Sequence, residues 1–563
     1  MKTILQFLIA ILSTQLTAQP LSGNVTIGSG GDYPNFTSNT GLFKAINDNG
    51  LNGNITATVI SDITELATVG LNEWTEFPSN SNFTLNIISN NDTEKIILSN
   101  AGSHVFRFNG ADRITIDGSI NGTGSYLNFV GWTQSVFFFS NGATNNQLKN
   151  LKISCRYATS GSVIFAASGN SNNLVENCEI FNRPAGTNYP KHGIHSYHIT
   201  NENNLFKNNK IYGFFEAGIY IESGDNVLIE GNEIYSDVGV YGIWFRNMTR
   251  IDILKNRIYN NNTAGLRDGI RFSYNGTFTG TGIITNIFNN MISLNPNVPS
   301  NIDGISLDSN NSEPVTVNLY HNTIVVSGSE DSSFSANGVE QIDVEFLNFR
   351  NNIVINTREN TRVTGQPGIS RCVSFTDNSG NSIVNSNNNV LFSSGINTWI
   401  GQWNATLTAS LNDWQTVSNL DLNSVSKNVT FTSETDLHLS GTSIGDSDLA
   451  TTSIASVTTD FDSEIRAENT YTGCDEVPNT LTTNDYVVSP TFLVYPNPAN
   501  EIIYIKTLGN SSDIFIEIYN NLGALVKETQ ATHEVKINDL QPGLYVMNIT
   551  QNNKQIVKKF IKQ

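Results

Sequence analysis

The chain has 563 residues, of which only 14% are charged, and its 31 basic and 50 acidic side chains give a net charge of −19. A chain of this length exceeds what one hydrophobic core usually supports, so several cores or an array of repeats are expected. The acidic balance argues against nucleic acid or an anionic membrane as a partner. Abundant Asn, Ser, Thr and Gly favour β-structure over helix.

The N-terminal segment has the three parts of a signal peptide. Lys2 supplies the positive charge, Ile4–Leu12 form a short apolar run, and Leu16–Ala18 end in a small residue. Residues 1–18 are therefore predicted to be a signal peptide that is cleaved on export. A buried strand or an anchoring helix is the alternative. The apolar run is too short to span a bilayer, and no later segment is long and apolar enough to span it as a helix.

The middle of the chain repeats a short motif in which Asn precedes a charged and then an apolar residue. The motif has nine related copies between residues 150 and 391, which follow one another at intervals of 23 to 37 residues. Three of the nine are Asn208-Asn-Lys-Ile211, Gly231-Asn-Glu-Ile234 and Lys255-Asn-Arg-Ile258. A second motif, Gly-Ile or Gly-Val, recurs from Gly193 to Gly368. Apolar residues alternate around both motifs, which indicates short strands.

Short strands joined by turns of variable length favour a coil in which each strand stacks on the same strand of the next coil. A propeller needs four strands per blade at regular spacing, and leucine-rich repeats need a helical pattern that is missing here. The predicted fold is therefore all-β, a right-handed parallel β-helix. The recurrent Asn is expected to form a ladder of side-chain hydrogen bonds along the stack. Its members are Asn209, Asn232, Asn256, Asn290, Asn322, Asn352 and Asn389.

This repeat pattern resembles the pectate-lyase-like superfamily of β-helix proteins in fold, without a diagnostic catalytic motif. The front of the chain agrees: Ile27–Phe36, followed by Gly41–Ile46, is similar to the opening of many such proteins. The resemblance implies a short amphipathic helix that caps the first coil. The Gly-rich run at the start lacks the Lys-Ser/Thr ending and the spacing of a nucleotide-binding loop.

The four cysteines are too few for a disulfide framework. If Ile153 stacks on Ile180, Cys178 lies four strand positions from Cys155, which is roughly 13 Å. That separation exceeds the reach of a disulfide, roughly 7 Å between Cα atoms. Both side chains are therefore predicted to be free thiols that fill the core.

Residues 401–459 are expected to complete the last coils and cover the open end. Asp460–Arg466 and Gly473–Glu476 then resemble a closing motif of secreted bacterial β-helix proteins, although Ser463 and Cys474 replace its usual Gly and Ala. The acidic residues of this motif raise calcium as a cofactor. A structural ion pair with Arg466 is the preferred interpretation, because the motif lacks a full calcium-ligand loop. The cofactor is otherwise unknown.

The C-terminal segment follows a polar linker and has six short predicted strands. Val494-Tyr-Pro-Asn-Pro-Ala499, Leu540-Gln-Pro-Gly-Leu-Tyr545 and the terminal Lys558-Lys-Phe560 together resemble the type IX secretion C-terminal sorting domain of Bacteroidota. The alternative is an ordinary immunoglobulin-like module that binds glycan. The resemblance implies passage across the outer membrane by the type IX secretion machinery, and a mature protein that is secreted or attached to the outer-membrane surface.

The predicted organisation has four parts. They are a signal peptide at 1–18, a parallel β-helix with its cap and closing region at 19–476, a linker at 477–490, and the sorting domain at 491–563, expected to be a small immunoglobulin-like β-sandwich.

Outward-facing residues of a β-helix form columns along the stack. The position after the Gly-Ile motif gives His195, Tyr220, Trp244, Arg271, Ser306 and Glu340. Two residues further on, the column reads Tyr197, Glu222, Arg246, Ser273 and Asp308. The preceding turns supply Tyr189, Lys191, His192, Glu216, Arg267, Asp268 and Asp303. Rings beside charged groups suit an elongated sugar chain, because sugar faces stack on rings and charges bind hydroxyls or acid substituents. The alternative is packing across strands only.

Two cleavage chemistries fit this face. Hydrolysis needs two carboxyl groups about 5–9.5 Å apart, which Glu222 with Asp268 or Glu216 can supply. Elimination from a uronate needs a cation and a base, from Arg246 or Arg271 with His195, Tyr220 or Lys191. The candidate catalytic residues are Glu222, Arg246, Asp268, Arg271 and His195. The candidate substrate-binding residues are Tyr197, Tyr220, Trp244, Lys191 and Arg267.

The run from Lys191 to His198 is rich in histidine but does not predict a metal site. His195 and His198 lie on opposite faces of a regular strand, so they cannot share one ion, and no metal ligand is assigned. The chain is predicted to be an exported protein that degrades an extracellular polysaccharide, as a lyase or glycoside hydrolase, or binds one. The alternative is a non-catalytic surface adhesin or structural β-helix. Neither a nucleic-acid partner nor a transmembrane segment in the mature protein is expected.

Overall fold

The structure is a computed structural model that describes residues 19–99, 101–156, 160–183, 188–260, 265–274, 282–309, 315–378, 380–477, 493–506, 514–520, 523–531, 533–551 and 554–563. The predicted signal peptide and nearly all of the predicted linker lie outside these ranges. The chain divides into two compact units, Met1–Pro478 and Asn479–Gln563, and each is described by itself. Among the described residues, no helix is long and apolar enough to cross a membrane.

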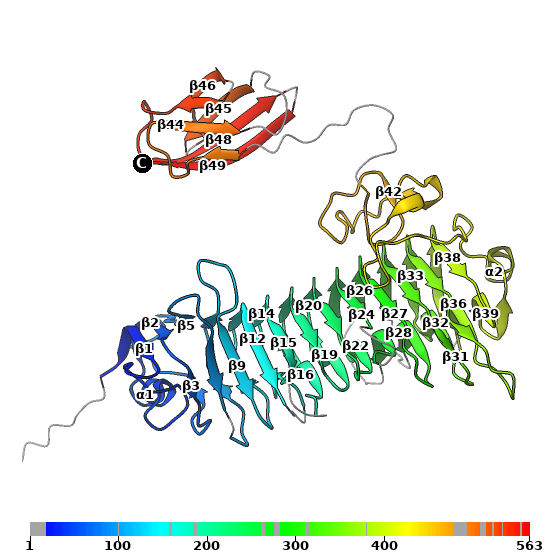
Figure 1. Cartoon of the computed structure of the whole chain (residues 1–563), viewed down its shortest axis with the longest axis horizontal. Coiled ribbons are helices and arrows are strands. Elements are labelled where there is room, and N and C mark those ends of the chain that lie inside the picture. Colours follow the sequence, from blue (N-terminus) through cyan, green and yellow to red (C-terminus); the bar gives the residue numbers. More distant parts are fainter. Residues whose placement is uncertain are drawn as a thin grey trace, which may run out of the picture. The chain divides into compact units, whose positions relative to one another are not determined.

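The first unit is a parallel β-helix (Figure 1). Each full coil contributes one strand to each of three sheets in turn, and neighbours within a sheet come from successive coils.

The first sheet contains β1 (Leu21–Ile27), β2 (Leu51–Val59), β5 (Leu85–Ser89), β8 (Ile114–Asp117), β11 (Gln147–Lys149), β14 (Leu174–Glu176), β17 (Leu205–Lys207), β20 (Val227–Glu230), β23 (Arg250–Leu254), β26 (Ile283–Phe288), β29 (Val315–Tyr320), β33 (Phe346–Arg350) and β37 (Ile383–Asn387).

The second sheet contains β3 (Ile63–Thr64), β6 (Lys95–Leu98), β9 (Leu127–Gly131), β12 (Leu151–Cys155), β15 (Glu179–Asn182), β18 (Lys210–Tyr212), β21 (Glu233–Tyr235), β24 (Arg257–Tyr259), β27 (Met291–Leu294), β30 (Thr323–Val326), β34 (Ile353–Asn356) and β38 (Val390–Ser393).

The third sheet contains β4 (Leu71–Asn72), β7 (Phe106–Asn109), β10 (Phe137–Ser140), β13 (Val163–Phe165), β16 (His192–Glu202), β19 (Ala217–Asp225), β22 (Tyr241–Phe245), β25 (Asp268–Tyr274), β28 (Ile302–Ser309), β32 (Ala336–Ile342), β36 (Ser370–Thr376), β39 (Thr398–Trp403) and β40 (Thr406–Thr408). A small parallel pair, β31 (Ser329–Glu330) and β35 (Glu359–Asn360), lies outside the three sheets.

Alternating apolar residues of all three sheets point inward and form one continuous core. Two short helices cover its ends, as Figure 1 shows. Helix α1 (Leu42–Asn49) buries Leu42, Phe43 and Ile46 at the N-terminal end, which confirms the predicted cap. Helix α2 (Leu411–Ser418) buries Trp414 at the other end, where the indole nitrogen donates to Asp421 Oδ2 at 2.8 Å.

The predicted Asn ladder is present between the first and second sheets. Each ladder side chain is buried, and its Oδ1 accepts hydrogen bonds from the previous member; Asn232 Nδ2, for example, donates to Asn256 Oδ1 at 2.9 Å. The residue before each ladder Asn turns the chain with a positive φ, such as 56° at Lys255. After glycine, Asn and Asp tolerate this left-handed conformation best, which explains the frequent Asn-Asn pairs.

Cys155 and Cys178 are buried and are not joined to each other by a disulfide, as predicted. Cys178 takes the ladder position one coil before Asn209, to whose Oδ1 it donates its backbone N–H at 3.0 Å.

The recurrent glycines form a column in the third sheet where strands of the second sheet approach closely. A Cβ on Gly242 would lie 2.5 Å from Ile258 Cγ2 and from the Gly269 carbonyl oxygen. The prediction that Gly368-Ile369 continues this column is wrong. Val339 pairs with Val373, so Cys372 occupies the place after Gly338. Gly368 lies in the loop before β36, which begins at Ser370.

The closing region differs from its expected role of covering only the open end. After α2, the chain passes back over the outer side of the second sheet through η1 (Gly441–Ser443), η2 (Ser447–Leu449), β41 (Ala450–Thr452) and β42 (Asn469–Tyr471). The predicted ion pair is present: buried Arg466 binds Glu476 Oε2 at 3.1 Å and also donates to Asn289 Oδ1 of the β-helix at 2.9 Å.

The second unit is a β-sandwich of two antiparallel sheets. One sheet contains β43 (Leu493–Tyr495), β44 (Ile502–Lys506) and β47 (Glu534–Lys536), and the other contains β45 (Ile514–Asn520), β46 (Leu525–Ala531), β48 (Gly543–Gln551) and β49 (Lys554–Lys562). Ile503, Ile516, Met547 and Phe560 pack into a single core between them. The predicted all-β fold, a β-helix followed by a small sandwich, is confirmed.

Candidate functional site

The first predicted column lies on the third sheet, from β16 to β32. Its members pair in register from one coil to the next: His195 with Tyr220, Tyr220 with Trp244, Trp244 with Arg271, Arg271 with Ser306, and Ser306 with Glu340. The second column is less regular. A register shift after Ser196 pairs Tyr197 with Ser223 instead of Glu222.

Three carboxyl groups gather on β25, β28 and β32, and we call Asp268, Asp303 and Glu340 the acid cluster. Asp268 and Asp303 are direct neighbours in the sheet. Asn337 Nδ2 donates to Asp303 Oδ1 at 2.7 Å and to Glu340 Oε1 at 3.3 Å, so these two oxygens lie no more than about 6 Å apart. Glu340 is also a member of the first column.

Two arginines flank the acid cluster. Arg271 Nη1 donates to Asp268 Oδ2 at 3.0 Å. Arg371 Nε donates to Asn337 Oδ1 at 2.8 Å and so fixes the amide that bridges Asp303 and Glu340. The arrangement holds three acidic groups and two basic groups on adjacent coils.

Burial makes these carboxyl groups weak acids. It raises the pKa of Asp268 to about 6, although the positive charge of Arg271 opposes the shift. The pKa of Asp303 is raised well above its usual value by burial and by the negative charges of Glu340 and Asp268. The pKa of Glu340 is also raised by burial, against the effect of Arg371. Burial thus favours the protonated form of all three carboxyl groups, and the positive charge of Arg271 counteracts it at Asp268.

The acid cluster lines a surface hollow of about 260 Å³. Its other charged lining residues are Arg267, Arg271 and Asp308. The volume lies below the roughly 300–1,000 Å³ of sites that enclose a whole drug-sized ligand.

A second group of predicted residues lies on β16, β19 and β22. Arg246 forms an ion pair with Glu222, and Lys191 Nζ forms one with Glu216 Oε2 at 2.9 Å. His195 Nδ1 shares a hydrogen bond with Ser160 Oγ at 2.7 Å. Burial and the positive charges of Lys191 and Arg246 lower the pKa of His195 to about 3, so its ring is neutral near pH 7.

The predicted aromatic residues stack mainly on one another. The ring centroids of His195 and Tyr220 are 4.8 Å apart, and those of Tyr220 and Trp244 are 4.2 Å apart. Arg246 lies over both Tyr220 and Trp244. Tyr220 is stacked between His195 and Trp244 and is buried, so it presents no open face, whereas Trp244 is stacked by a ring on one side. Tyr197 is the most exposed of the predicted substrate-binding aromatics, at 37%.

Glu222 and Asp268 are far apart for a pair of catalytic carboxyl groups. Asp268 pairs with Tyr241 on β22, and Tyr241 pairs with Ala217 on β19. Glu222 is thus two strands and five residues away, roughly 19 Å between Cα atoms. Glycosidases hold the two carboxyl groups within about 9.5 Å. Asp268 has closer acidic neighbours in Asp303 and Glu340. Both were predicted to lie on this face, but no role was predicted for either.

The histidines of the run 191–198 have separate partners. His198 Nδ1 lies 3.0 Å from Thr200 Oγ1, whereas His195 contacts Ser160. Across the described part of the chain, one group of side chains has the spacing of metal ligands. It is His438, Asp462 and Asp475 in the closing region, away from the residues of the acid cluster.

Two family models match the chain. Residues 192–413 match the right-handed β-helix region, and residues 493–563 match the secretion system C-terminal sorting domain. No curated protein matches the sequence.

Several solved structures are similar at 14% identity or less. An alginate lyase from Paenibacillus sp. is 14% identical, with a TM-score of 0.34, over 57% of this chain and 97% of its own. The catalytic domain of an α-1,3-glucanase, solved with tetrasaccharides, is 13% identical, with a TM-score of 0.30, over 70% of this chain and 67% of its own. A tailspike protein of an Acinetobacter baumannii bacteriophage, a capsular polysaccharide depolymerase, is 10% identical, with a TM-score of 0.28, over 90% and 73%. Scores this low assign no function to the chain.

Proposed function

We propose that this protein, which consists of a right-handed β-helix and a type IX secretion sorting domain and is secreted or attached to the cell surface, hydrolyses an extracellular polysaccharide. The acid cluster carries the proposal. Buried carboxyl groups with raised pKa values that line a hollow are typical of catalytic sites, since ordinary packing gives no reason to bury three of them together.

The environments of Asp268 and Asp303 suggest their roles. Burial and the negative charges of Glu340 and Asp268 favour the protonated form of Asp303, which can donate a proton to the glycosidic oxygen as general acid. Arg271 favours the ionised form of Asp268, which can act as the base or nucleophile on the other side of the bond. Pairs of carboxyl groups with separated pKa values divide acid and base work in this way. Asp268 and Asp303 pair directly on neighbouring strands, which are about 4.8 Å apart, so their carboxyl groups can approach the roughly 5–5.5 Å of retaining glycosidases.

An eliminative lyase is the second candidate, and His195 is the observation that favours it. Its ring is neutral, and its buried Nε2 has no hydrogen-bond partner among the described residues. A neutral imidazole can take the C5 proton of a uronate, while Arg246 neutralises the uronate carboxylate. Arg246 is already paired with Glu222, however, so hydrolysis at the acid cluster fits better.

Incubation of the secreted protein with neutral and uronate-containing glycans tests the proposal. New reducing ends without ultraviolet-absorbing unsaturated sugar are expected, which indicates hydrolysis. Unsaturated product would favour the lyase, and retention of the glycan without cleavage would favour an adhesin. Absence of both cleavage and retention across the panel would contradict a glycan-directed function.

The variant Asp303→Asn is expected to lower kcat by at least about 100-fold, because it removes the proton donor. Asp237→Asn, in an exposed turn of a nearby coil, is the matched control and should retain full turnover. Reducing-end assays on both purified proteins measure the difference. Normal turnover by Asp303→Asn would exclude the acid cluster as the catalytic site. Loss of turnover in His195→Ala alone would move the reaction to the second group.

A further inference from the structure

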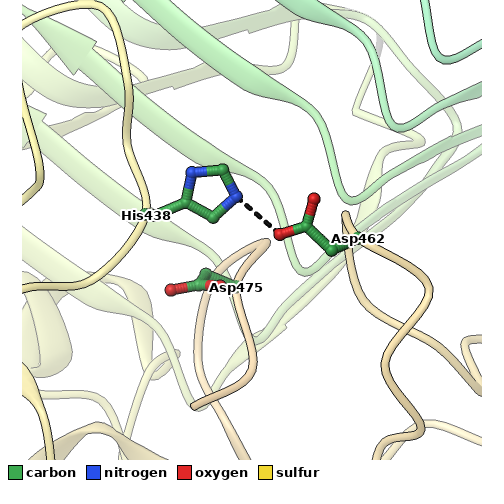
Figure 2. Close-up of side chains that lie close together, drawn as sticks. All are labelled: His438, Asp462 and Asp475. Atoms are coloured by element: carbon green, nitrogen blue, oxygen red, sulfur yellow. Dashed lines mark hydrogen bonds and ion pairs between the residues drawn. The ribbon is translucent and has the colours of Figure 1, made fainter.

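The closing region brings His438, Asp462 and Asp475 together from three separate stretches of chain, as Figure 2 shows. His438 precedes Leu439, which is bridged to Phe431, and Asp462 lies in the turn between the bridged residues Thr459 and Ile465. Asp475 follows β42. One ligand atom from each of the three side chains lies within 4.8 Å of the other two. A point between three such atoms is no more than about 2.8 Å from each, close to the roughly 2.0–2.2 Å of zinc bonds.

The hydrogen bonds around His438 already orient it as a metal ligand. Nδ1 is bonded to Asp436 Oδ1, and Nε2 lies 2.7 Å from Asp462 Oδ2 (Figure 2). A carboxylate on the far ring nitrogen is the usual support of a metal-bound histidine, because it fixes the ring and its tautomer. Nε2 therefore faces the two remaining carboxylates while Asp436 holds the ring from behind.

Asp475 supplies an independent observation. Its residue is 8% exposed, and its Oδ2 accepts the backbone N–H of Leu439 at 2.7 Å. Among the described residues, no hydrogen-bond donor reaches Asp475 Oδ1. No described lysine or arginine forms an ion pair with Asp436, Asp462 or Asp475. Three carboxylates thus surround a single histidine. Asp475 Oδ1 can therefore take a further partner, and a largely buried carboxylate is stabilised by a cation beside it.

We propose that this group binds one Zn²⁺ through His438 Nε2 and the carboxylates of Asp462 and Asp475. A nitrogen ligand and two carboxylates suit zinc, whereas calcium takes six to eight oxygen ligands. Zinc displaces the proton on Nε2, and Asp462 exchanges its hydrogen bond to that nitrogen for a bond to the metal. Asp462 is half exposed, so water can occupy the remaining position.

The site has a structural role in the closing region. Its three ligands lie on three loops that are not neighbours in sequence, so one ion links these loops to each other. Neighbouring residues of the same loops bind the β-helix: Asn289 Nδ2 donates to Thr459 O at 2.8 Å, and the backbone N–H of Cys474 donates to Thr323 Oγ1 at 3.0 Å. Zinc therefore holds the closing region against the second sheet. This inference is independent of the proposed hydrolysis.

Tag-free secreted protein, treated with chelator and then titrated with Zn²⁺ alone, tests the proposal. One bound zinc per chain is expected by calorimetry and by elemental analysis, and zinc should slow proteolysis within residues 420–477. Absence of saturable binding would overturn the proposal. Protection by Ca²⁺ without protection by Zn²⁺ would also overturn it.

Variants locate the site. His438→Ala and Asp475→Asn should weaken zinc binding at least about 100-fold, and Asp436→Asn about 10- to 100-fold, the usual effect of losing the partner of a ligand. Asp462→Asn is the conservative variant, since this exposed side chain is the least needed for folding. His198→Ala is the matched control and should bind zinc normally. Zinc affinity that is unchanged in Asp462→Asn and His438→Ala, or lost equally in His198→Ala, would refute the site.

Discussion

Single aspartates of this protein differ in charge because their surroundings differ. Asp303 is buried beside Glu340 and Asp268, so its carboxyl group stays protonated. Asp32 is exposed and accepts hydrogen bonds from the backbone and side chain of Thr26, which lower its pKa. The residue type alone therefore does not reveal an acid or a base. The neighbours on adjacent coils decide which carboxyl group can donate a proton.

The pH dependence of stability follows from the raised pKa of Asp303. The unfolded carboxyl group titrates near 3.8, whereas the folded one keeps its proton to a much higher pH. Above about pH 4 the folded state thus binds more protons than the unfolded state, and the free energy of unfolding falls as the pH rises. Asp303→Asn is neutral at every pH, so we expect it to be more stable than the wild type at pH 7.

Urea unfolding of both proteins at pH 4 and pH 7 measures this effect. The difference between the two midpoints should be small at pH 4 and large at pH 7. A difference that does not change with pH would show that Asp303 is ionised in the folded protein, and would also remove its role as general acid.

The β-helix depends on elements in which one residue type fills the same place on every coil. Each ladder Asn satisfies backbone groups of two coils: Asn290 accepts from the backbone N–H and Nδ2 of Asn256, and donates to Ile253 O at 2.9 Å. A similar row on the first sheet, Asn286, Asn318 and Asn348, is linked at 2.8 Å but is only partly buried. The two rows have the same chemistry and different solvent exposure.

Asn290→Ala is expected to destabilise the β-helix by about 1–3 kcal/mol, because it leaves the buried N–H of Asn256 without an acceptor. Asn318→Ala is the matched control and should cost less than about 1 kcal/mol, since water can replace its partly exposed bonds. Chemical denaturation followed by far-ultraviolet circular dichroism measures both. Equal losses in the two variants would show that burial does not set the strength of the ladder.

The sequence predicted those elements that every coil repeats. The ladder Asn, the Gly column and the first column of outward residues each reflect one steric or hydrogen-bonding need, so their spacing survives turns of variable length. The acid cluster was predicted only in part. Arg371 was missed because Gly368 was aligned with the Gly column, although Cys372 holds that place. Glu222 does not align with Tyr197 as predicted, because the register shifts after Ser196 and Tyr197 pairs with Ser223. Local irregularities of this kind leave no periodic signal.

At the scale of the whole molecule, the two units divide the work of the protein. The β-helix supplies a long face of stacked strands, and the candidate site lies on this face. The sandwich at 493–563 matches a sorting domain and contributes none of the candidate site residues. Its separate hydrophobic core indicates that it folds without the packing of the β-helix.

Removal of residues 493–563 should therefore abolish export without unfolding the β-helix. In the producing bacterium, the truncated protein is expected to remain inside the outer membrane, because the sorting domain is the part that the type IX secretion machinery recognises. Fractionation of cells and medium, with an antibody against the β-helix, measures the location, and circular dichroism of the purified truncated protein checks its fold. If the truncated protein turns over glycan normally in lysate and none is found outside the cell, the sorting domain is needed for export and not for activity. Normal export of the folded, truncated protein would instead place the sorting signal elsewhere in the chain.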